Sequence, residues 1–172
     1  MKKIVVNDTN VFIDLYEVGL LEEFFSLPWE VHTTDFVMLE LQREGQHETV
    51  ARYKADKRLV VPILDAKEML EIGNMYQRLM NRTNLSLTDC SVWYYAKVNK
   101  YILLTGDRKL RTASTYDGVE VHGIIYVFDS LVDLEIISRQ VAFEKLQQLY
   151  KINPRLPKEE IDRRINLWKA NI

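Results

Sequence analysis

Short apolar runs alternate along this chain with longer segments in which apolar residues recur at helical spacing. Two parallel strands need a long crossover between them, and that crossover is usually a helix. The alternation therefore predicts an α/β fold in which helices cover both faces of a central parallel sheet. The expected strands span residues 3–6, 30–33, 59–61, 101–105 and 119–127, the last range including the exit from the strand.

Capping residues and helix breakers predict where the intervening helices begin and end. Helical turns are expected from residue 10 to about 25, with an interruption at Gly19. The next helix is capped by Thr34 or Asp35, runs to about residue 43 and is closed by Gly45. Further helices are expected over 48–57, over 65–82 with Met69 on its apolar side, over 86–99, over 108–115, and after a cap at Asp129 or Ser130.

The segment 153–157, Asn-Pro-Arg-Leu-Pro, is the plausible joint in the chain. A charged helix is expected over 158–170, with a narrow apolar stripe of Ile161, Ile165 and Trp168. We therefore divide the chain into a main domain, residues 1–137, and a C-terminal helical extension, residues 138–172. The stripe predicts that the extension either packs on the main domain or is used for dimerisation or another partner contact.

Cysteine and histidine usage limits the chemistry that the chain can perform. Cys90 is the single cysteine, which excludes an internal disulfide and a cysteine-based zinc site. The three histidines lack metal-ligand spacing, so a metal would need oxygen ligands, as Mg²⁺ and Mn²⁺ prefer. No Ser-His-Asp or Cys-His arrangement and no glycine-rich nucleotide-binding motif is found.

Size and composition indicate a globular protein of one main domain. The chain has 172 residues, of which 47% are apolar and 28% charged. The net charge of −2 does not by itself indicate a nucleic-acid-binding protein. We expect a cytoplasmic protein with no membrane association, because no signal peptide is recognisable and no apolar run approaches the ~20 residues of a membrane span.

Four acidic residues fall where the predicted fold could bring them to one edge of the sheet. Asp8 and Asp107 each follow a strand, and Asp89 lies in the first turn of the helix 86–99. Glu40 lies on or beside the apolar face of its helix, where an ionised carboxylate is costly without a partner. Glu44 is the competing candidate on the same helix face.

Each acid also has an ordinary structural explanation. Asp8 and Asp107 are suitable helix N-caps, Asp89 has capping-box spacing from Ser86, and Glu40 could reach water from the edge of its helix. Together, however, four neighbouring carboxylates stay ionised only when a cation offsets their repulsion. One or two Mg²⁺ ions held there could activate water for phosphodiester hydrolysis. The basic residues Arg108, Lys109 and Arg111 are candidates for contacts with phosphate.

Four short motifs, at residues 6–13, 37–41, 85–91 and 103–107, resemble in this order those of the PIN-domain family of metal-dependent ribonucleases. The resemblance covers about residues 1–135. It implies a three-layer α/β/α sandwich and an endoribonuclease that uses Mg²⁺ or Mn²⁺, with Asp8, Glu40, Asp89 and Asp107 as the metal-binding, catalytic acids. Asn10 matches the polar residue that assists the first acid, and Thr105 matches the Ser or Thr two residues before the last.

The resemblance also implies partners. Many small bacterial members resemble VapC-type toxins of toxin–antitoxin pairs, which cleave RNA and are inhibited by a small antitoxin protein. Dimers are frequent in the family, so a homodimer is expected. The extension from residue 138 lies outside the resemblance and makes this chain longer than those toxins.

Two other functions remain open from the residues alone. A phosphoryl-transfer fold of the haloacid dehalogenase or receiver type also places an Asp after the first strand, but the former expects a second Asp at position 10, which is Asn here. Receiver domains need an acidic pair near the first strand, and of Asn7 and Asp8 only Asp8 is acidic. A catalytically inert RNA-binding or protein-interaction module with the same fold is the non-enzymatic alternative.

Overall fold

A sheet of five parallel strands lies at the centre of the computed structural model, which describes residues 2–42 and 45–169. The strand order is β3-β2-β1-β4-β5, so the chain builds outward from β1 first on one side and then on the other. Ligands of such sheets bind at the carboxyl ends of the two strands where this reversal occurs, here β1 and β4. The strands are β1 (Lys3–Asn7), β2 (Trp29–His32), β3 (Leu59–Val60), β4 (Ile102–Leu104) and β5 (Val121–His122).

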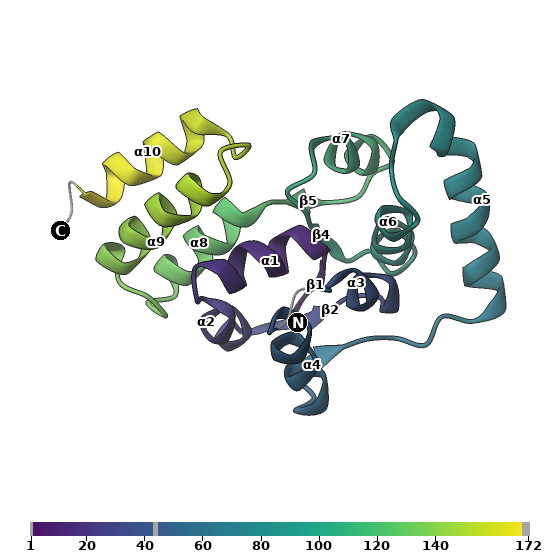
Figure 1. Ribbon diagram of the computed structural model, residues 1–172, viewed down its shortest axis with the longest axis horizontal. Coiled ribbons are helices and arrows are strands. Elements are labelled where there is room, and N and C mark those ends of the chain that lie inside the picture. Colours follow the sequence, from purple (N-terminus) through teal and green to yellow (C-terminus); the bar gives the residue numbers. More distant parts are fainter. Residues whose placement is uncertain (1, 43–44, 170–172) are drawn as a thin grey trace.

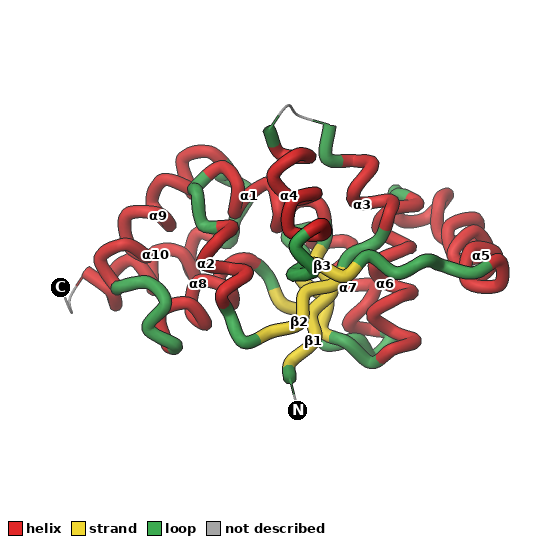
Figure 2. The backbone as a smooth tube through the Cα atoms, turned by 90° about the horizontal axis from the view of Figure 1, so that it is seen from below, coloured by secondary structure: helices red, strands yellow, loops and turns green. Residues whose placement is uncertain are grey.

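Helices cover both faces of the sheet, as Figure 2 shows. The helices α5 and α6 lie on one side, and α1, α2 and α8 lie on the other, with α9 and α10 outside them (Figures 1 and 2). This is the α/β/α arrangement that the sequence predicts. The helices are α1 (Thr9–Glu17), α2 (Leu21–Ser26), α3 (Asp35–Glu40), α4 (Gln46–Ala55), α5 (Ala66–Thr83), α6 (Leu87–Asn99), α7 (Arg108–Tyr116), α8 (Ile124–Asp133), α9 (Arg139–Ile152) and α10 (Lys158–Lys169).

The predicted strand over 119–127 is wrong beyond His122. Gly123 caps α8, and Asp129 and Ser130, which were expected to cap the next helix, lie inside α8. A short apolar run does not by itself distinguish a strand from a buried helix. The buried residues of α8 are Ile124, Ile125, Val127, Phe128 and Leu131, and four of them, Ile124, Val127, Phe128 and Leu131, have helical spacing.

The helix that carries Glu40 is also shorter than expected. α3 ends at Glu40, whereas residues 43 and 44, including the competing candidate Glu44, lie outside the described residues. Gly45 does not close α3 but is the N-cap of α4, with a φ of 86° that favours glycine. Met69, which is expected on the apolar side of α5, is 44% exposed.

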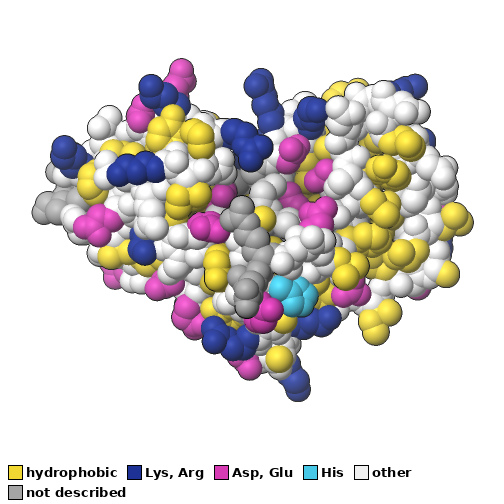
Figure 3. All heavy atoms as spheres, viewed as in Figure 1, with side chains coloured by type: hydrophobic (Ala, Val, Ile, Leu, Met, Phe, Trp, Pro, Cys, Tyr) yellow, Lys and Arg dark blue, Asp and Glu magenta, His cyan; other side chains and the backbone are white. Residues whose placement is uncertain are grey.

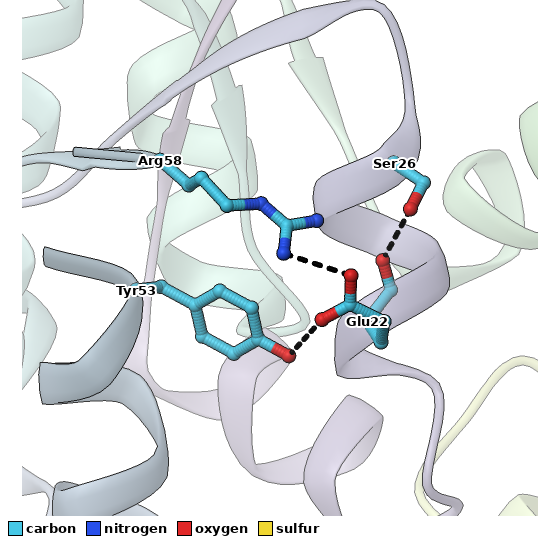
Figure 4. Close-up of polar contacts among 4 residues, drawn as sticks. All are labelled: Glu22, Ser26, Tyr53 and Arg58. Atoms are coloured by element: carbon cyan, nitrogen blue, oxygen red, sulfur yellow. Dashed lines mark hydrogen bonds and ion pairs between the residues drawn. The ribbon is translucent and has the colours of Figure 1, made fainter. Parts of the chain in front are cut away.

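An aromatic and ionic cluster fastens α4 to α2 (Figure 4). The carboxylate of Glu22 accepts hydrogen bonds from the Tyr53 hydroxyl at 3.0 Å and from Arg58 Nη1 at 2.8 Å. The ring of Tyr53 stacks on Phe25 with centroids 3.9 Å apart. These contacts position the chain that returns from Glu40 toward the edge strand β3.

The C-terminal helices pack on α8 of the same chain. Ile161 and Trp168 of the predicted apolar stripe are buried, and the Trp168 ring stacks on Phe128 with centroids 6.3 Å apart. Arg164 forms two hydrogen bonds of 2.8 Å with the Asp129 carboxylate. The buried part of the stripe is therefore covered within this chain. None of the described helices has the length and apolar character needed to cross a membrane.

Candidate active site at the carboxyl edge of the sheet

The fold brings the four predicted acids to the carboxyl edge of the sheet. Asp8 follows β1, Glu40 is the last residue of α3, Asp89 lies in the first turn of α6, and Asp107 is the N-cap of α7. Figure 3 looks onto this edge and shows acidic side chains gathered in a hollow at its centre. Asp8 lies within electrostatic range of Asp89 and Glu40, and Asp89 within range of Asp107.

Asp8 is the most deeply placed of the four, with 2% of its surface exposed. Its Oδ1 accepts a hydrogen bond of 2.7 Å from the Thr9 amide. Its Oδ2 accepts bonds from the Asn10 side-chain amide at 2.8 Å and from the Thr105 hydroxyl at 2.7 Å. The pKa of Asp8 is raised to about 7, mainly by burial; the Thr105 hydrogen bond opposes this rise, and the nearby carboxylates Asp89 and Glu40 add to it.

The two predicted supporting residues connect Asp8 to the turn after β4. The Asn10 amide oxygen accepts a bond of 2.7 Å from the Gly106 backbone N–H. Thr105 Oγ1 also accepts a bond of 3.0 Å from the Asp107 N–H. A Cβ on Gly106 would lie 3.2 Å from Asn10 Oδ1, so glycine permits this close approach. Asp8 and Asp107 are therefore held in one continuous hydrogen-bond network.

Thr9 is a contributor that the sequence reasoning missed. Its hydroxyl donates a hydrogen bond of 2.7 Å to Glu40 Oε2. Glu40 is exposed, so of the two positions left open by the sequence it has the one at the edge of the helix, with its carboxylate reaching water. The helix ends at Glu40, where the helix dipole disfavours a negative charge. The bond from Thr9 offsets part of that cost and directs Glu40 toward Asp8.

Asp89 and Asp107 have the capping roles that their positions suggest. Asp89 Oδ2 accepts from the Ser86 N–H at 2.7 Å, and Asp107 Oδ1 accepts from the Leu110 N–H at 2.7 Å. The other oxygen of each carboxylate accepts no hydrogen bond from the described part of the chain. Burial raises the pKa of Asp89, and Asp107 and Glu40 raise it further. Capping thus leaves one carboxylate oxygen of each residue for another ligand.

The donor chemistry of this site fits a hard divalent cation. The candidate ligands are carboxylate oxygens whose mutual repulsion a cation would relieve. Within residues 2–42 and 45–169, no three Asp, Glu, His or Cys side chains are close enough together to hold a metal ion. Mg²⁺ is usually bound through one or two carboxylates and several waters, and it does not require a closed set of protein ligands.

The predicted phosphate-contacting residues differ in how they are held. Arg111 Nη2 donates a hydrogen bond of 3.1 Å to the Thr105 carbonyl and packs against Gly123, where a Cβ would collide with it. Arg108 and Lys109 are exposed, and their side chains form no hydrogen bond or ion pair with another described residue. Arg111 is therefore a fixed cation beside the Thr105–Asp107 turn.

A parallel sheet with an acidic hollow at its switch point defines a class of α/β proteins that act on ligands at the strand ends. A family model described as a PIN domain matches residues 4–170, and the chain belongs to the PIN-domain family. The match includes α9 and α10, so the expectation that the chain from residue 138 lies outside the family resemblance is wrong. PIN domains are generally nucleases.

Solved structures with a similar fold have low sequence identity to this chain. PAE2754 from Pyrobaculum aerophilum is 16% identical, covers 77% of this chain and 99% of its own, and has a TM-score of 0.52. VapBC2 from Rickettsia felis, bound to a DNA fragment from its promoter, is 15% identical, covers 70% of this chain and 98% of its own, and has a TM-score of 0.48. FitAcB from Neisseria gonorrhoeae is 14% identical, covers 71% of this chain and 99% of its own, and has a TM-score of 0.45. No curated protein matches the chain.

Proposed function

We propose that this protein is a ribonuclease that hydrolyses RNA phosphodiester bonds with Mg²⁺ or Mn²⁺ held by Asp8, Glu40, Asp89 and Asp107. The observation that carries the proposal is the environment of Asp8. Its carboxylate is buried, receives three fixed hydrogen bonds and lies in the field of two further carboxylates. Burying a charge beside like charges is costly, and a bound cation would compensate for that cost.

The residues of the site would have three different roles: metal binding, orientation of the carboxylates and phosphate contact. The carboxylates would bind the metal, and when bound it would lower the pKa of a coordinated water and stabilise the leaving oxygen. Asn10 and Thr105 orient the Asp8 carboxylate, and Thr9 orients Glu40. Arg111, fixed at the Thr105 carbonyl, is positioned to contact a phosphate near the site.

Metal removal tests the proposal directly. We expect the EDTA-treated protein to leave a single-stranded RNA oligonucleotide intact, and addition of Mg²⁺ or Mn²⁺ to restore cleavage. A DNA oligonucleotide of the same sequence, run in parallel, measures the preference for RNA. Gel analysis of the fragments distinguishes internal cleavage from digestion of the ends. Cleavage that persists in EDTA would contradict a metal-dependent nuclease.

A catalytically inert RNA-binding or protein-interaction module is the second candidate function. The observation that favours it is the absence of a close three-ligand group among the described residues. Calorimetric titration with Mg²⁺ separates the two functions. Binding that is lost in an Asp89→Asn variant supports the nuclease, whereas no measurable binding supports the inert module.

Thr9 offers a sharper test, because no sequence pattern singles it out. Replacing Thr9 with Val keeps the branched shape and removes the donor to Glu40, and we expect metal affinity to fall by about 10- to 100-fold. Thr9→Ser retains the hydroxyl and should bind metal like the unmodified protein. Calorimetric titration of both variants with Mn²⁺ provides the comparison. Equal affinities would show that the Thr9–Glu40 bond has no role in metal binding.

We further propose that the protein works in the cytoplasm, forms a homodimer and is inhibited by a small antitoxin protein. The family resemblance of the four sequence motifs is what motivates these proposals. Light scattering of the purified chain measures its oligomeric state. Cell growth after induction of the chain, with and without neighbouring genes, tests for a toxin and its antitoxin.

A further inference from the structure

The connection between α9 and α10, residues 153–157, is anchored beside α1. Asn153 Nδ2 lies 3.2 and 3.4 Å from the two carboxylate oxygens of Asp14, a buried residue of α1. Leu156 is also buried, and Gln148 of α9 donates a bond of 3.4 Å to the Glu17 carbonyl. Together with the packing of α10 on α8, these contacts give the connection a defined position on the main body of the protein (Figure 1).

The anchor point lies one helical turn from the candidate active site. Asp14 follows Asn10 by four residues in α1, so the two side chains lie on the same helix face about 6 Å apart along the axis. Asn10 in turn donates its hydrogen bond to Asp8. The α9–α10 connection therefore reaches α1 next to the residues that hold Asp8.

This connection brings an unpaired cation to that position. Arg155 is exposed and lies within electrostatic range of Asp14, whose pKa burial raises to about 6 and Arg155 lowers. Arg155 forms no ion pair or hydrogen bond through its side chain with any residue in the described ranges. Its guanidinium group is therefore free to bind an anion, and five N–H donors suit it to phosphate.

A polyanion bound at an acidic hollow needs cations along its path on both sides of the cleavage point. Figure 3 shows Lys and Arg side chains along the upper border of the hollow. On the α7 side, Arg111 is fixed at the Thr105 carbonyl. Arg155 supplies a cation on the α1 side. The two cations come from different elements, Arg111 from α7 and Arg155 from the connection that is anchored on α1.

We propose that Arg155 binds a backbone phosphate of single-stranded RNA one helical turn of α1 away from the cleavage site, so that the C-terminal extension forms part of the substrate-binding surface. The inference rests on the proposed ribonuclease function. It gives the extension a role in binding substrate that its packing alone does not require.

Charge reversal at Arg155 tests this role. We expect Arg155→Glu to weaken binding of a fluorescent single-stranded RNA by about tenfold in EDTA, where cleavage cannot interfere, and to reduce the slope of log K against log salt by about one. With Mg²⁺, KM should rise by a similar factor while kcat stays the same. Arg155→Lys should retain most of the binding. Arg163→Glu, the same charge change at an exposed position of α10, should leave binding and its salt slope unchanged.

The outcomes separate this inference from the proposed function. RNA binding by Arg155→Glu equal to that of the unmodified protein overturns the role of Arg155, whether or not RNA is cleaved. Equal losses in Arg155→Glu and Arg163→Glu also overturn it, because they would reflect net charge alone. RNA that is bound with the expected dependence on Arg155 but not cleaved with any metal would contradict the ribonuclease function and leave the binding surface supported. Thermal melting of each variant confirms that it is folded.

Discussion

Asp8→Asn should reduce RNA cleavage by more than a hundredfold and, at pH 8, make the metal-free protein more stable. Loss of a residue that only supports a metal ligand typically costs 10- to 100-fold, so loss of a ligand itself should cost more. The opposite effect on stability arises because Asp8 is ionised in a buried site. The difference between its pKa of about 7 and the ordinary 3.8 corresponds to at most about 4 kcal/mol at pH 8. The Asn variant avoids this cost but places two amide groups, those of residues 8 and 10, close together.

Paired measurements of cleavage and thermal melting in EDTA check this prediction. Asp56→Asn is the matched control, because Asp56 is an exposed carboxylate at the end of α4, and it should change neither quantity. Loss of activity accompanied by a lower melting temperature would indicate that Asp8 has a structural role. Unchanged cleavage by Asp8→Asn would exclude Asp8 as a metal ligand in the reaction.

The metal-free protein should lose stability as the pH rises from 5 to 8. Both Asp8 and Asp14 have folded-state pKa values above those of the unfolded chain, at about 7 and about 6, and burial is the main cause of each. The folded protein therefore holds protons that the unfolded chain releases. Their stabilising effect is complete below about pH 4 and is lost as the pH passes through 6 and 7. The sum for the two residues is several kcal/mol at most.

Thermal melts in EDTA at pH 5, 6, 7 and 8 measure this dependence. Asp14→Asn should remove the loss of stability centred near pH 6, and Asp8→Asn should remove the loss centred near pH 7. Saturating Mg²⁺ at pH 8 should restore the stability that is lost when Asp8 ionises, because a bound cation favours the ionised carboxylate. The lowered pKa of Glu22 acts in the opposite direction, but only below this pH range. A stability that rises steadily from pH 5 to 8 in EDTA would contradict the burial of both carboxylates.

Local sequence patterns were sufficient to predict the parallel sheet and the edge at which the four acids meet. The caps at Asp65, Ser86 and Asp107 are short-range features, since each bonds to a backbone N–H three residues ahead. The run 119–127 was assigned wrongly beyond His122 because its apolar residues satisfy either a strand or a buried helix. Packing of α8 against the sheet decides between the two.

The roles of Thr9 and Arg155 depend on contacts between distant parts of the chain. Thr9 reaches Glu40, 31 residues away, and Asn153 fixes the connection that carries Arg155 to Asp14, 139 residues away. No periodicity or local motif encodes such pairs, because they form only when the helices have packed. The direction of Glu40 stayed open for the same reason, and the structure shows that α3 ends at Glu40 and that its side chain is exposed.

By itself, the sequence determined the class of fold, the family resemblance and the acids that form the candidate site. These properties follow from hydrophobic periodicity, helix caps and the placement of polar residues at the ends of elements, all of which act over a few residues. Only the tertiary structure decided that Asp8 is buried among three donors, that Thr9 orients Glu40 and that the extension lies against α1 and α8. Burial, long-range hydrogen bonds and electrostatic fields are properties of the packed chain, and so they could not be read from any local segment.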